Sequence, residues 1–354
     1  MKKNSRLLIT NVLNADIDGE WFFHPKPQSK PITIKEAFKD LPEKSVFEFK
    51  YLSENLQKAC QEYYKINPHK NYRCRYMREA LLKHTGKTGG FIGFMPLYWK
   101  KVAPTVTKQW IARAGLIHPS GKRYLSIEEI QRLCSFPDDF IFVGSFEDRL
   151  ARMGNSVPPL LARAIALNLK QSSFLKKVDS PTVVSLFAGC GGSSLGFHLA
   201  GFKELLAVEW DDNAIATFKM NFPNVPVFHG DIAKLSVEEA LNLTGLKPKE
   251  LDCLQGSPPC QGFSTVGKRR ATDSRNTLFK EFVRLVQGFQ PKCFVMENVS
   301  GIVKGHMKPF YLSAVSDLRS CGYKVKGQLL NSKYYGVPQS RERVIVVGAR
   351  NDLF

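Results

Sequence analysis

The sequence predicts an α/β protein in which a doubly wound, mostly parallel sheet is joined to a smaller, strongly basic domain. Three observations favour this fold class. From residue 182 onward, short apolar runs alternate with stretches of helical length, a pattern typical of a parallel sheet with helices on its faces. A glycine-rich turn follows the first of these runs, where such sheets bind their ligands. The positive charge is concentrated in the N-terminal half.

The composition indicates a globular protein that is long enough for two domains. The chain has 354 residues, of which 43% are hydrophobic and 23% charged. It has no apolar stretch of membrane-spanning length and no signal peptide. We therefore expect a cytosolic protein, in a bacterial cytosol or nucleoid, with no membrane partner. The eight cysteines are scattered without a Cys-x-x-Cys pair, so neither a zinc ribbon nor a disulfide framework is predicted.

The charge distribution favours a polyanionic partner. Residues 58–123 contain 14 Lys or Arg and two Glu, a net charge of +12, whereas residues 181–354 have 21 basic and 15 acidic residues, a net charge of +6. A strongly basic domain joined to a less basic one suggests that the partner is a nucleic acid. A solvated basic face is the alternative.

Residues 1–20 are assigned to the larger domain and residues 21–150 to the smaller one. Thr33 should cap a short helix over 34–38, and an amphipathic helix is predicted over 52–66. The rest of 43–102 lacks clear periodicity. Its interleaved basic and aromatic residues suit contacts with DNA grooves from loops, although an ordinary irregular domain would look similar.

Two further helices and a linker are predicted before the sheet begins. Ser126 and Glu129 form a capping box at the start of a helix over 126–133. Asn155 or Ser156 should cap a helix over 160–169, and residues 151–170 are assigned to the return into the larger domain. Residues 171–181 are polar, charged and end in proline, as is typical of a linker.

The larger domain, 182–354, is predicted to alternate between strands and helices. The expected strands are 182–187, 205–208, 225–229, 251–254, 293–296, 323–330 and 343–348, and the expected helices are 193–200, 211–220, 236–243, 277–289 and 307–320.

The first turn of this sheet is expected to hold an adenosine cofactor. Its glycines, Gly189, Gly191 and Gly192, let a ligand approach the backbone at a helix N-terminus. Glu209 follows 20 residues later and could accept from ribose hydroxyls. The spacing differs from the dinucleotide pattern, which argues against a pyrophosphate. Asp231 could accept from the adenine amine. Phe187 and Trp210 could flank the adenine or face a sulfonium, unless they pack in the core.

A nucleophile candidate lies after the strand 251–254. The loop 256–264, Gly-Ser-Pro-Pro-Cys-Gln-Gly-Phe-Ser, presents the thiol of Cys260 behind two stiffening prolines, at the sheet edge where ligands bind. The alternative is a small, buried apolar residue.

Five motifs together resemble those of the cytosine-5 DNA methyltransferases. They are Phe-Ala-Gly-Cys-Gly-Gly (187–192), Pro-Pro-Cys-Gln (258–261), Glu-Asn-Val (297–299), Gln-Ser-Arg-Glu-Arg (339–343) and Gly-Asn-Ser-Val (154–157). The resemblance covers nearly the whole chain. It implies a class I, Rossmann-like methyltransferase that uses S-adenosylmethionine, needs no metal, and methylates carbon 5 of a flipped cytosine in a short word of double-stranded DNA.

The resemblance also implies roles for individual residues. Cys260 would attack carbon 6, Glu297 would bind ring nitrogen 3, and Arg341 and Arg343 would hold the base's carbonyl oxygen. The cofactor would be bound by Phe187, Ala188, Gly189, Gly191, Gly192, Glu209, Trp210, Asp231, Ile232, Pro259, Leu278, Asn155 and Ser156. DNA contacts are expected from Gln261, Ser264, Gln339, Arg73, Arg75, Arg78 and Lys87.

The order of the motifs departs from the family's usual order. Gly-Asn-Ser-Val normally comes last and here comes first, and residues 22–42 resemble the passage that normally follows Gln-x-Arg-x-Arg. The sequence therefore predicts a circular permutation, rejoined through 171–181, in which the basic stretch 43–102 replaces the recognition region. The helix after Asn155 should then pack beside the first strand of the sheet.

Several functions remain open from the sequence. A monomeric modification enzyme paired with a separate restriction endonuclease is the favoured interpretation. The alternatives are a transfer-RNA cytosine methyltransferase of the same fold and a non-catalytic, methyltransferase-like DNA-binding protein. A dinucleotide-dependent oxidoreductase is disfavoured by the glycine pattern.

Overall fold

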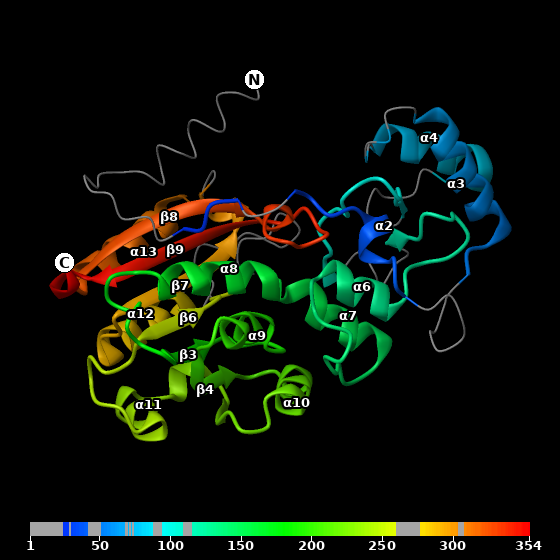
Figure 1. Ribbon diagram of the computed structural model, residues 1–354. Helices are drawn as coiled ribbons and strands as arrows, with labels where there is room; N and C mark the ends of the chain where they lie inside the picture. Colours follow the sequence, from blue (N-terminus) through cyan, green and yellow to red (C-terminus); the bar gives the residue numbers. More distant parts are fainter. Residues whose placement is uncertain are drawn as a thin grey trace. The chain divides into compact units, whose positions relative to one another are not determined.

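The computed structural model describes residues 24–27, 30–41, 51–67, 70, 72, 74–87, 94–108, 115–259, 277–303 and 308–354 (Figure 1). The chain divides into two compact units. The first contains Met1–Gln28, Pro159–Ser332 and Glu342–Phe354, and the second contains Ser29–Pro158 and Lys333–Arg341. The segment 333–341 thus belongs to the second unit, although the sequence analysis had placed it in the sheet domain.

The first unit is built on a seven-stranded sheet in the order β5-β4-β3-β6-β7-β9-β8. The five strands from β5 to β7 are parallel, while β9 runs antiparallel to both of its neighbours. Because β9 is reversed, its beginning lies at the same edge as the carboxyl end of β7. The strands are β3 Thr182–Leu186, β4 Lys203–Glu209, β5 Val227–His229, β6 Cys253–Gly256, β7 Cys293–Val299, β8 Tyr323–Asn331 and β9 Glu342–Arg350.

Alternating side chains of the strands pack in two layers. Val184 and Leu186 of β3 share one buried cluster with apolar residues of α11, α12 and α13, whereas Ser185 between them hydrogen-bonds within the layer of α9. The period of two in the strands thus assigns one face to each layer. The helices of this unit are α8 Pro159–Lys170, α9 Gly192–Leu199, α10 Asp212–Asn221, α11 Val237–Thr244, α12 Thr277–Phe289 and α13 Lys308–Ser320, with short 3-10 turns η2 Ile232–Lys234, η5 Ser300–Val303, η7 Ser332–Tyr334 and η8 Asn351–Leu353.

Helix α8 packs closely on α9 (Figure 1). A Cβ added at Gly196 of α9 would lie 2.4 Å from the Cβ of Ala162 and 2.5 Å from the carbonyl oxygen of Pro159. The helix that follows Gly-Asn-Ser-Val therefore lies against the helix after the first strand. The sequence analysis had expected it beside the strand itself.

The segment between α8 and β3 is ordered. Leu175 is fully buried, and its amide donates to the carbonyl of Ser172 at 3.2 Å. The ring of Phe174 contacts that of Phe354 edge to face, with ring centroids 6.2 Å apart. The passage predicted to be a linker is thus a compact turn held by the C-terminal residue.

The second unit is mainly helical. It contains α2 Ile34–Ala37, α3 Glu54–Ile66, α4 Cys74–Thr85, α6 Ile127–Leu133 and α7 Phe146–Asn155, with one pair of two-residue parallel strands, β1 Met95–Pro96 and β2 Leu116–Ile117. Capping boxes start α2 at Thr33 and α6 at Ser126, as the sequence predicts. Within the described ranges of the chain, no helix is long and apolar enough to cross a membrane.

Two expectations for this unit are wrong, and one helix was missed. The stretch that contains α4 was expected to be loop, yet it is a helix with Met77, Ala80 and Leu81 buried along one face. Helix α7 was not predicted. Ser156 forms the C-cap of α7 rather than the N-cap of α8, because its amide donates to the carbonyl of Arg152 at 3.1 Å.

Candidate active site

Most of the predicted site residues of the first unit lie at the carboxyl edge of its parallel strands. The glycine turn follows β3, Glu209 ends β4, and Asp231 comes shortly after β5. The Pro258-Pro259 loop follows β6, and Glu297 lies near the end of β7. In open α/β sheets this edge is where ligands bind.

The glycine turn has a left-handed backbone at three of its positions. Phe187, Gly189 and Gly191 have φ values of +56°, +57° and +93°. For Phe187 this conformation is strained, and such strain concentrates at functional sites. A Cβ at Gly191 would lie 2.4 Å from the ring of Phe222. The turn therefore requires glycine at 191, both for its backbone angles and for this packing.

Glu209 holds the turn in place. One carboxylate oxygen accepts from the amide of Gly189 at 2.8 Å, and the other accepts from the amides of Trp210 and Asp211 at 2.9 and 3.0 Å. The oxygen that accepts from Gly189 keeps a second acceptor site, so a ribose hydroxyl could still bind Glu209. Trp210 beside it is 75% exposed, which leaves its ring available for stacking.

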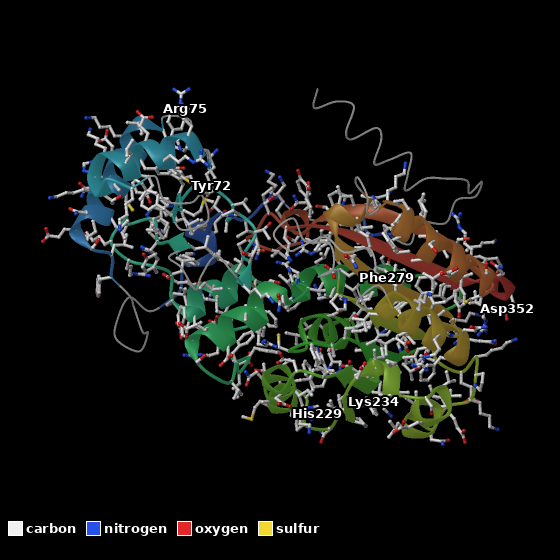
Figure 2. The ribbon with its side chains drawn as sticks, turned by 180° about the vertical axis from the view of Figure 1, so that it is seen from behind. Tyr72, Arg75, His229, Lys234, Phe279 and Asp352 are labelled. Carbon is white, nitrogen blue, oxygen red and sulfur yellow. The ribbon has the colours of Figure 1, made fainter. Side chains whose placement is uncertain are left out.

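The other cofactor candidates of this unit follow β5 or lie on α12. Asp231 caps η2 by accepting from the amide of Ala233 at 3.0 Å. Ile232 is buried, and Leu278 is half-buried against the main core cluster. Figure 2 shows the η2 end of the unit, with His229 and Lys234 labelled.

The loop that leads into Cys260 is tied to β7. The side-chain amide of Asn298 donates to the carbonyl of Pro258 at 3.0 Å, and Asn298 is buried. Sequence reasoning gave Asn298 no role, although it lies inside the Glu-Asn-Val motif. Cys260, Gln261 and Ser264 lie outside the described residues, so their predicted roles stay predictions.

Glu297 and Arg343 form an ion pair across β7 and β9. Nε of Arg343 lies 2.8 Å from Oε1 of Glu297, and both side chains are largely buried. Burial lowers the pKa of Arg343, while the carboxylate of Glu297 opposes this shift. Arg343 pairs with Val299 in the antiparallel register of β7 and β9. Both charged groups therefore lie at the edge of the sheet where the glycine turn follows β3.

Two other predicted site residues serve the second unit instead. Gln339 is fully buried; its side chain accepts from the amide of Val106 at 3.0 Å and donates to the carbonyl of Leu133 at 3.2 Å. Its predicted contact with DNA is therefore corrected, because no surface of this side chain is exposed.

Arg341 is likewise committed to the protein backbone. It is 3% exposed, and its guanidinium donates to the carbonyls of Val106 at 2.9 Å and Gly154 at 3.0 Å. A Cβ at Gly154 would lie 2.5 Å from the amide nitrogen of Lys108. We therefore reassign Arg341 from catalysis to holding the segment around Val106 against the Gly-Asn-Ser-Val motif.

The candidate DNA-contacting residues that are described lie on or after α4. Arg75 and Arg78 are exposed, and Arg75 points outward from the helix (Figure 2). Its guanidinium lies 5.5 Å from the ring centroid of Tyr76. Lys87 is exposed beyond the end of α4. Arg73 lies outside the described residues.

The aromatic residues of this unit mostly form its core. Tyr63, Phe94 and Tyr98 are buried, and their rings contact one another with centroids about 6 Å apart. The interpretation of these aromatics as groove contacts is therefore wrong for these three residues. Trp99 is 39% exposed and remains available.

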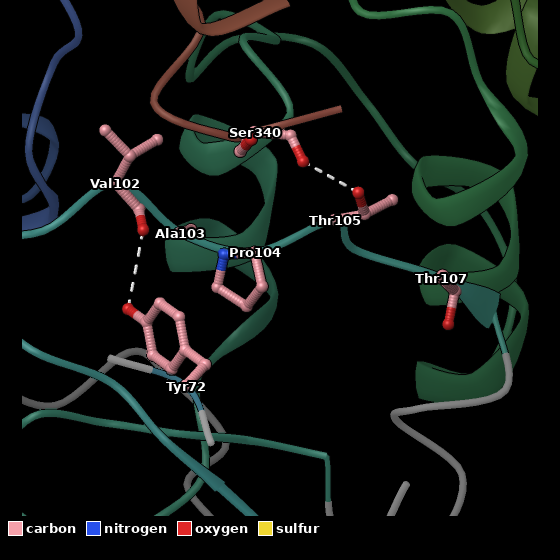
Figure 3. Close-up of a pocket in the computed structure, with 7 residues that line it drawn as sticks. All are labelled: Tyr72, Val102, Ala103, Pro104, Thr105, Thr107 and Ser340. Carbon is pink, nitrogen blue, oxygen red and sulfur yellow. Dashed lines mark hydrogen bonds between the residues drawn. The ribbon is translucent and has the colours of Figure 1, made fainter. Parts of the chain in front are cut away.

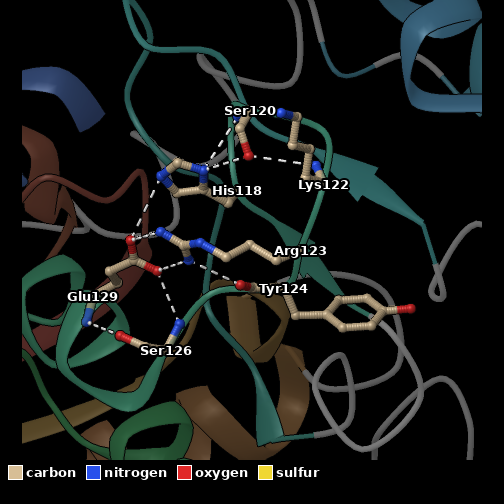
Figure 4. A network of polar contacts seen from close by, with 7 residues as sticks. All are labelled: His118, Ser120, Lys122, Arg123, Tyr124, Ser126 and Glu129. Carbon is tan, nitrogen blue, oxygen red and sulfur yellow. Dashed lines mark hydrogen bonds and ion pairs between the residues drawn. The ribbon is translucent and has the colours of Figure 1, made fainter. Parts of the chain in front are cut away.

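A polar network fixes the turn between β2 and α6 (Figure 4). Arg123 donates to both carboxylate oxygens of Glu129 at 2.8 Å, while Nε2 of His118 lies 3.6 Å from the same carboxylate. Burial lowers the pKa of His118 to about 4 despite this neighbour. The imidazole is thus neutral near pH 7 and acts as a structural group.

The second unit also contains a pocket of about 400 Å³ beside the Gln-Ser-Arg segment (Figure 3). Thr105 donates to the carbonyl of Ser340 at 2.7 Å, and Tyr72 donates to that of Val102 at 3.4 Å. The lining residues are Tyr72, Val102, Ala103, Pro104, Thr105, Thr107 and Ser340. None of them was predicted as a site residue.

Asn155 and Ser156 belong to the second unit. The hydroxyl of Ser156 donates to the carbonyl of Met153 at 2.8 Å, while Asn155 is exposed. Their predicted place at the cofactor stays a prediction. Among the residues that the structure describes, no cluster of His, Cys, Asp and Glu could hold a metal ion.

Comparison with known proteins places these motifs in one family. The family model described as C-5 cytosine-specific DNA methylase matches residues 6–171 and 181–354. The Type II methyltransferase M.AquIA of Picosynechococcus is 42% identical over 177 residues, which cover 48% of this chain and 71% of that protein. M.DdeI of Desulfomicrobium norvegicum is 45% identical over 175 residues, covering 48% of this chain and 41% of that protein.

Solved structures match over a similar share of the chain. A candidate DNA modification methyltransferase encoded within an E. coli prophage is 35% identical, with a TM-score of 0.44, and the match covers 49% of this chain and 48% of that one. The Dnmt2 methyltransferase of S. pombe is 22% identical with a TM-score of 0.39, covering 48% and 51%. The chain thus spans about half the length of most relatives that it matches.

Proposed function

The chain belongs to the C-5 cytosine-specific DNA methylase family, and on this premise we propose that it methylates carbon 5 of cytosine in a specific short word of double-stranded DNA. One observation carries the proposal. Glu297, held by Arg343, lies at the same sheet edge as the glycine turn and the loop that leads into Cys260. These are the three parts that a covalent methyl transfer to a pyrimidine needs.

The residues at the glycine turn fit S-adenosylmethionine. Phe187, Gly189 and Gly191 have left-handed backbone angles, Glu209 keeps an acceptor site for a ribose hydroxyl, and Trp210 offers an exposed ring. The bound cofactor would supply a methyl group on a sulfonium sulfur. The residues of the first unit that would hold it are Phe187, Ala188, Gly189, Gly191, Gly192, Glu209, Trp210, Asp231, Ile232, Pro259 and Leu278.

The chain's own groups would activate the base. The Cys260 thiolate adds to carbon 6 of a cytosine that has been flipped out of the duplex. Glu297 binds ring nitrogen 3, so the ring can accept the electron pair and carbon 5 becomes nucleophilic. After methyl transfer, loss of the carbon 5 proton to water expels the thiol. Arg343 keeps Glu297 in position and offers its remaining donors to the carbonyl oxygen of the base.

We also propose the circular permutation. The family model matches in two blocks, and the gap between them, 172–180, falls inside the segment 171–181 where the rejoining is predicted. The imidazole of His24 pairs with the carbonyl oxygen of Ile345 on β9 at 2.9 Å, which keeps the passage 24–27 next to the strand that it would follow in an unpermuted chain. Helix α8, which follows the Gly-Asn-Ser-Val motif, packs on α9, the helix that follows the first strand of the sheet.

The names of the curated relatives suggest the biological role of this chain. The curated relatives are Type II methyltransferases, so this chain would act as a monomeric modification enzyme, paired with a separate restriction endonuclease in a bacterial cytosol. DNA contacts would come from Arg75, Arg78 and Lys87 of the second unit, together with Arg73, Gln261 and Ser264.

A trapping experiment tests the mechanism. A duplex in which 5-fluorocytosine replaces the target cytosine blocks loss of the carbon 5 substituent, so the enzyme should remain attached through Cys260. Cys260→Ala should lower methyl transfer by about 10⁴-fold or more, because the covalent step is lost, while S-adenosylhomocysteine binding stays within about twofold. Mass spectrometry of the adduct and calorimetric binding are the measurements. Absence of an adduct at Cys260 would refute the mechanism.

The same assay separates the alternatives. Methyl incorporation into duplex DNA but not into transfer RNA supports the DNA enzyme, and the reverse result supports the transfer-RNA enzyme. A protein that binds DNA without incorporating any methyl group would be a non-catalytic relative. Bisulfite sequencing of DNA from expressing cells gives the target word.

A further inference from the structure

A buried polar network lies directly beneath the glycine turn of the first unit. It involves Ser185 of β3, Glu204 of β4 and Gln255 of β6, three adjacent strands of the sheet. The register of β3 and β4 shifts between Val183 and Val184. This shift turns Glu204 to the face that carries Ser185, which is the face covered by α9.

Two hydrogen-bonded links join this network to the first turn of α9. The hydroxyl of Ser193 donates to Oε1 of Gln255 at 2.6 Å, and Nε2 of Gln255 donates to the hydroxyl of Ser185 at 2.6 Å. The hydroxyls of Ser185 and Ser194 both donate to Oε1 of Glu204, the latter at 2.8 Å. Ser193 and Ser194 come immediately after Gly191 and Gly192.

The carboxylate of Glu204 is costly to bury. Its side chain has no exposed surface, and its second oxygen lies 3.2 Å from Nε2 of His198. Within the described part of the chain, neither that oxygen nor Nε2 of His198 has a hydrogen-bond partner, so the two groups meet in a close polar contact. A buried carboxylate often contributes less to the free energy of unfolding than an apolar side chain packed in its place would. Satisfied polar networks instead fix one geometry.

The opposite side of the turn is packed by aromatic rings. Phe222 leaves no space for a Cβ at Gly191, and the ring of His198 meets Phe222 edge to face with centroids 4.9 Å apart. His198 thus contacts both the carboxylate and the ring that backs the turn. The first turn of α9 is held from the sheet side and from the α10 side.

We propose that Gln255 and Glu204 are positioning residues that anchor Ser193 and Ser194 to the sheet and thereby set the backbone of the glycine turn for the adenosine cofactor. This inference rests on the proposed use of S-adenosylmethionine at that turn. The sequence signal is a glutamine in an otherwise apolar strand, Cys253-Leu254-Gln255-Gly256.

The test measures cofactor binding apart from folding. Gln255→Leu and Ser193→Ala should each weaken S-adenosylhomocysteine binding about five- to tenfold by calorimetry, the effect of one or two lost buried hydrogen bonds. Ser193→Thr keeps a hydroxyl and should restore binding to within about twofold of the wild type. Hydrogen exchange without ligand should quicken at amides 189–194 in the two weakened variants and remain unchanged in β8.

A matched control separates positioning from stability. Ser236→Ala removes the hydroxyl that caps α11 in the same unit; it should lower the unfolding temperature but leave cofactor affinity unchanged. Equal affinity in Gln255→Leu, Ser193→Ala and the wild type would overturn the inference while leaving the proposed function intact. A wild type that binds no S-adenosylhomocysteine would instead refute the proposed function, and the inference with it.

Discussion

At the scale of single residues, His24 shows how a side chain can be fixed in one protonation state. It is buried, and burial lowers its pKa to about 4 while the hydrogen bond to Ile345 opposes the shift. In the unfolded chain a histidine titrates near its usual 6.5. The folded protein therefore binds fewer protons than the unfolded one between pH 6.5 and 4.

This difference predicts an acid dependence of stability. The contribution of His24 is fully present above pH 6.5 and is lost as the pH falls toward 4, by up to about 3 kcal/mol. His24→Gln keeps a donor for the Ile345 carbonyl but does not titrate. Urea unfolding at several pH values should give a shallower loss for the variant than for the wild type. Parallel curves over that range would contradict the assignment.

The position of a motif side chain could be predicted from the sequence only where neighbouring strands of the sheet determine that position. Glu209 ends β4 and Glu297 lies near the end of β7, two parallel strands, so the fold places them at one edge. Gln339 and Arg341 come from an equally specific motif, yet they are buried in the second unit. The letters of the motif do not reveal which side chains face the base, because that depends on contacts from Val106 and Leu133, more than 200 residues earlier in the chain.

At the scale of elements, the contact between α8 and α9 depends on the absence of a side chain at Gly196. An added methyl group would overlap Ala162 and the backbone at Pro159 and Arg163, at 2.4–2.6 Å.

Gly196→Ala should therefore lower the free energy of unfolding by about 1–3 kcal/mol, the usual cost of overpacking, despite the better helix propensity of alanine. Gly301→Ala is the control, because a Cβ at Gly301 would meet nothing within 4 Å and should change stability by less than about 0.5 kcal/mol. Chemical denaturation measures both. A neutral Gly196→Ala would show that the helices can separate freely.

The elements of the sheet were predictable because their apolar periodicity is strong. The helices α4 and α7 were not predicted, for two different reasons. In α4 the buried positions Met77, Ala80 and Leu81 are spaced at helical intervals, but charged residues lie between and around them and obscure the pattern. In α7 the cap is Ser145 with Asp148 in place of the usual Glu, and so the signal was weaker.

At the scale of the whole molecule, the motif order makes a prediction about connectivity. A chain reordered as residues 171–354 followed by 1–170 should fold and methylate the same DNA word, because it keeps Phe174 and Leu175 and would change which ends are joined rather than which contacts form. Methyl incorporation and bisulfite sequencing compare the two chains, and a catalytically dead variant, Cys260→Ala in the reordered chain, is the control. Loss of folding in the reordered chain alone would contradict the permutation.

The compact turn between α8 and β3 bears on engineering. Leu175 is fully buried, and the ring of Phe174 contacts that of Phe354. A domain inserted into this turn would displace Phe174 and Leu175. A tag fused after Phe354 would disturb the contact between Phe354 and Phe174. Fusion partners are better placed elsewhere, because the segment that the sequence predicts to be a linker is a packed part of the fold.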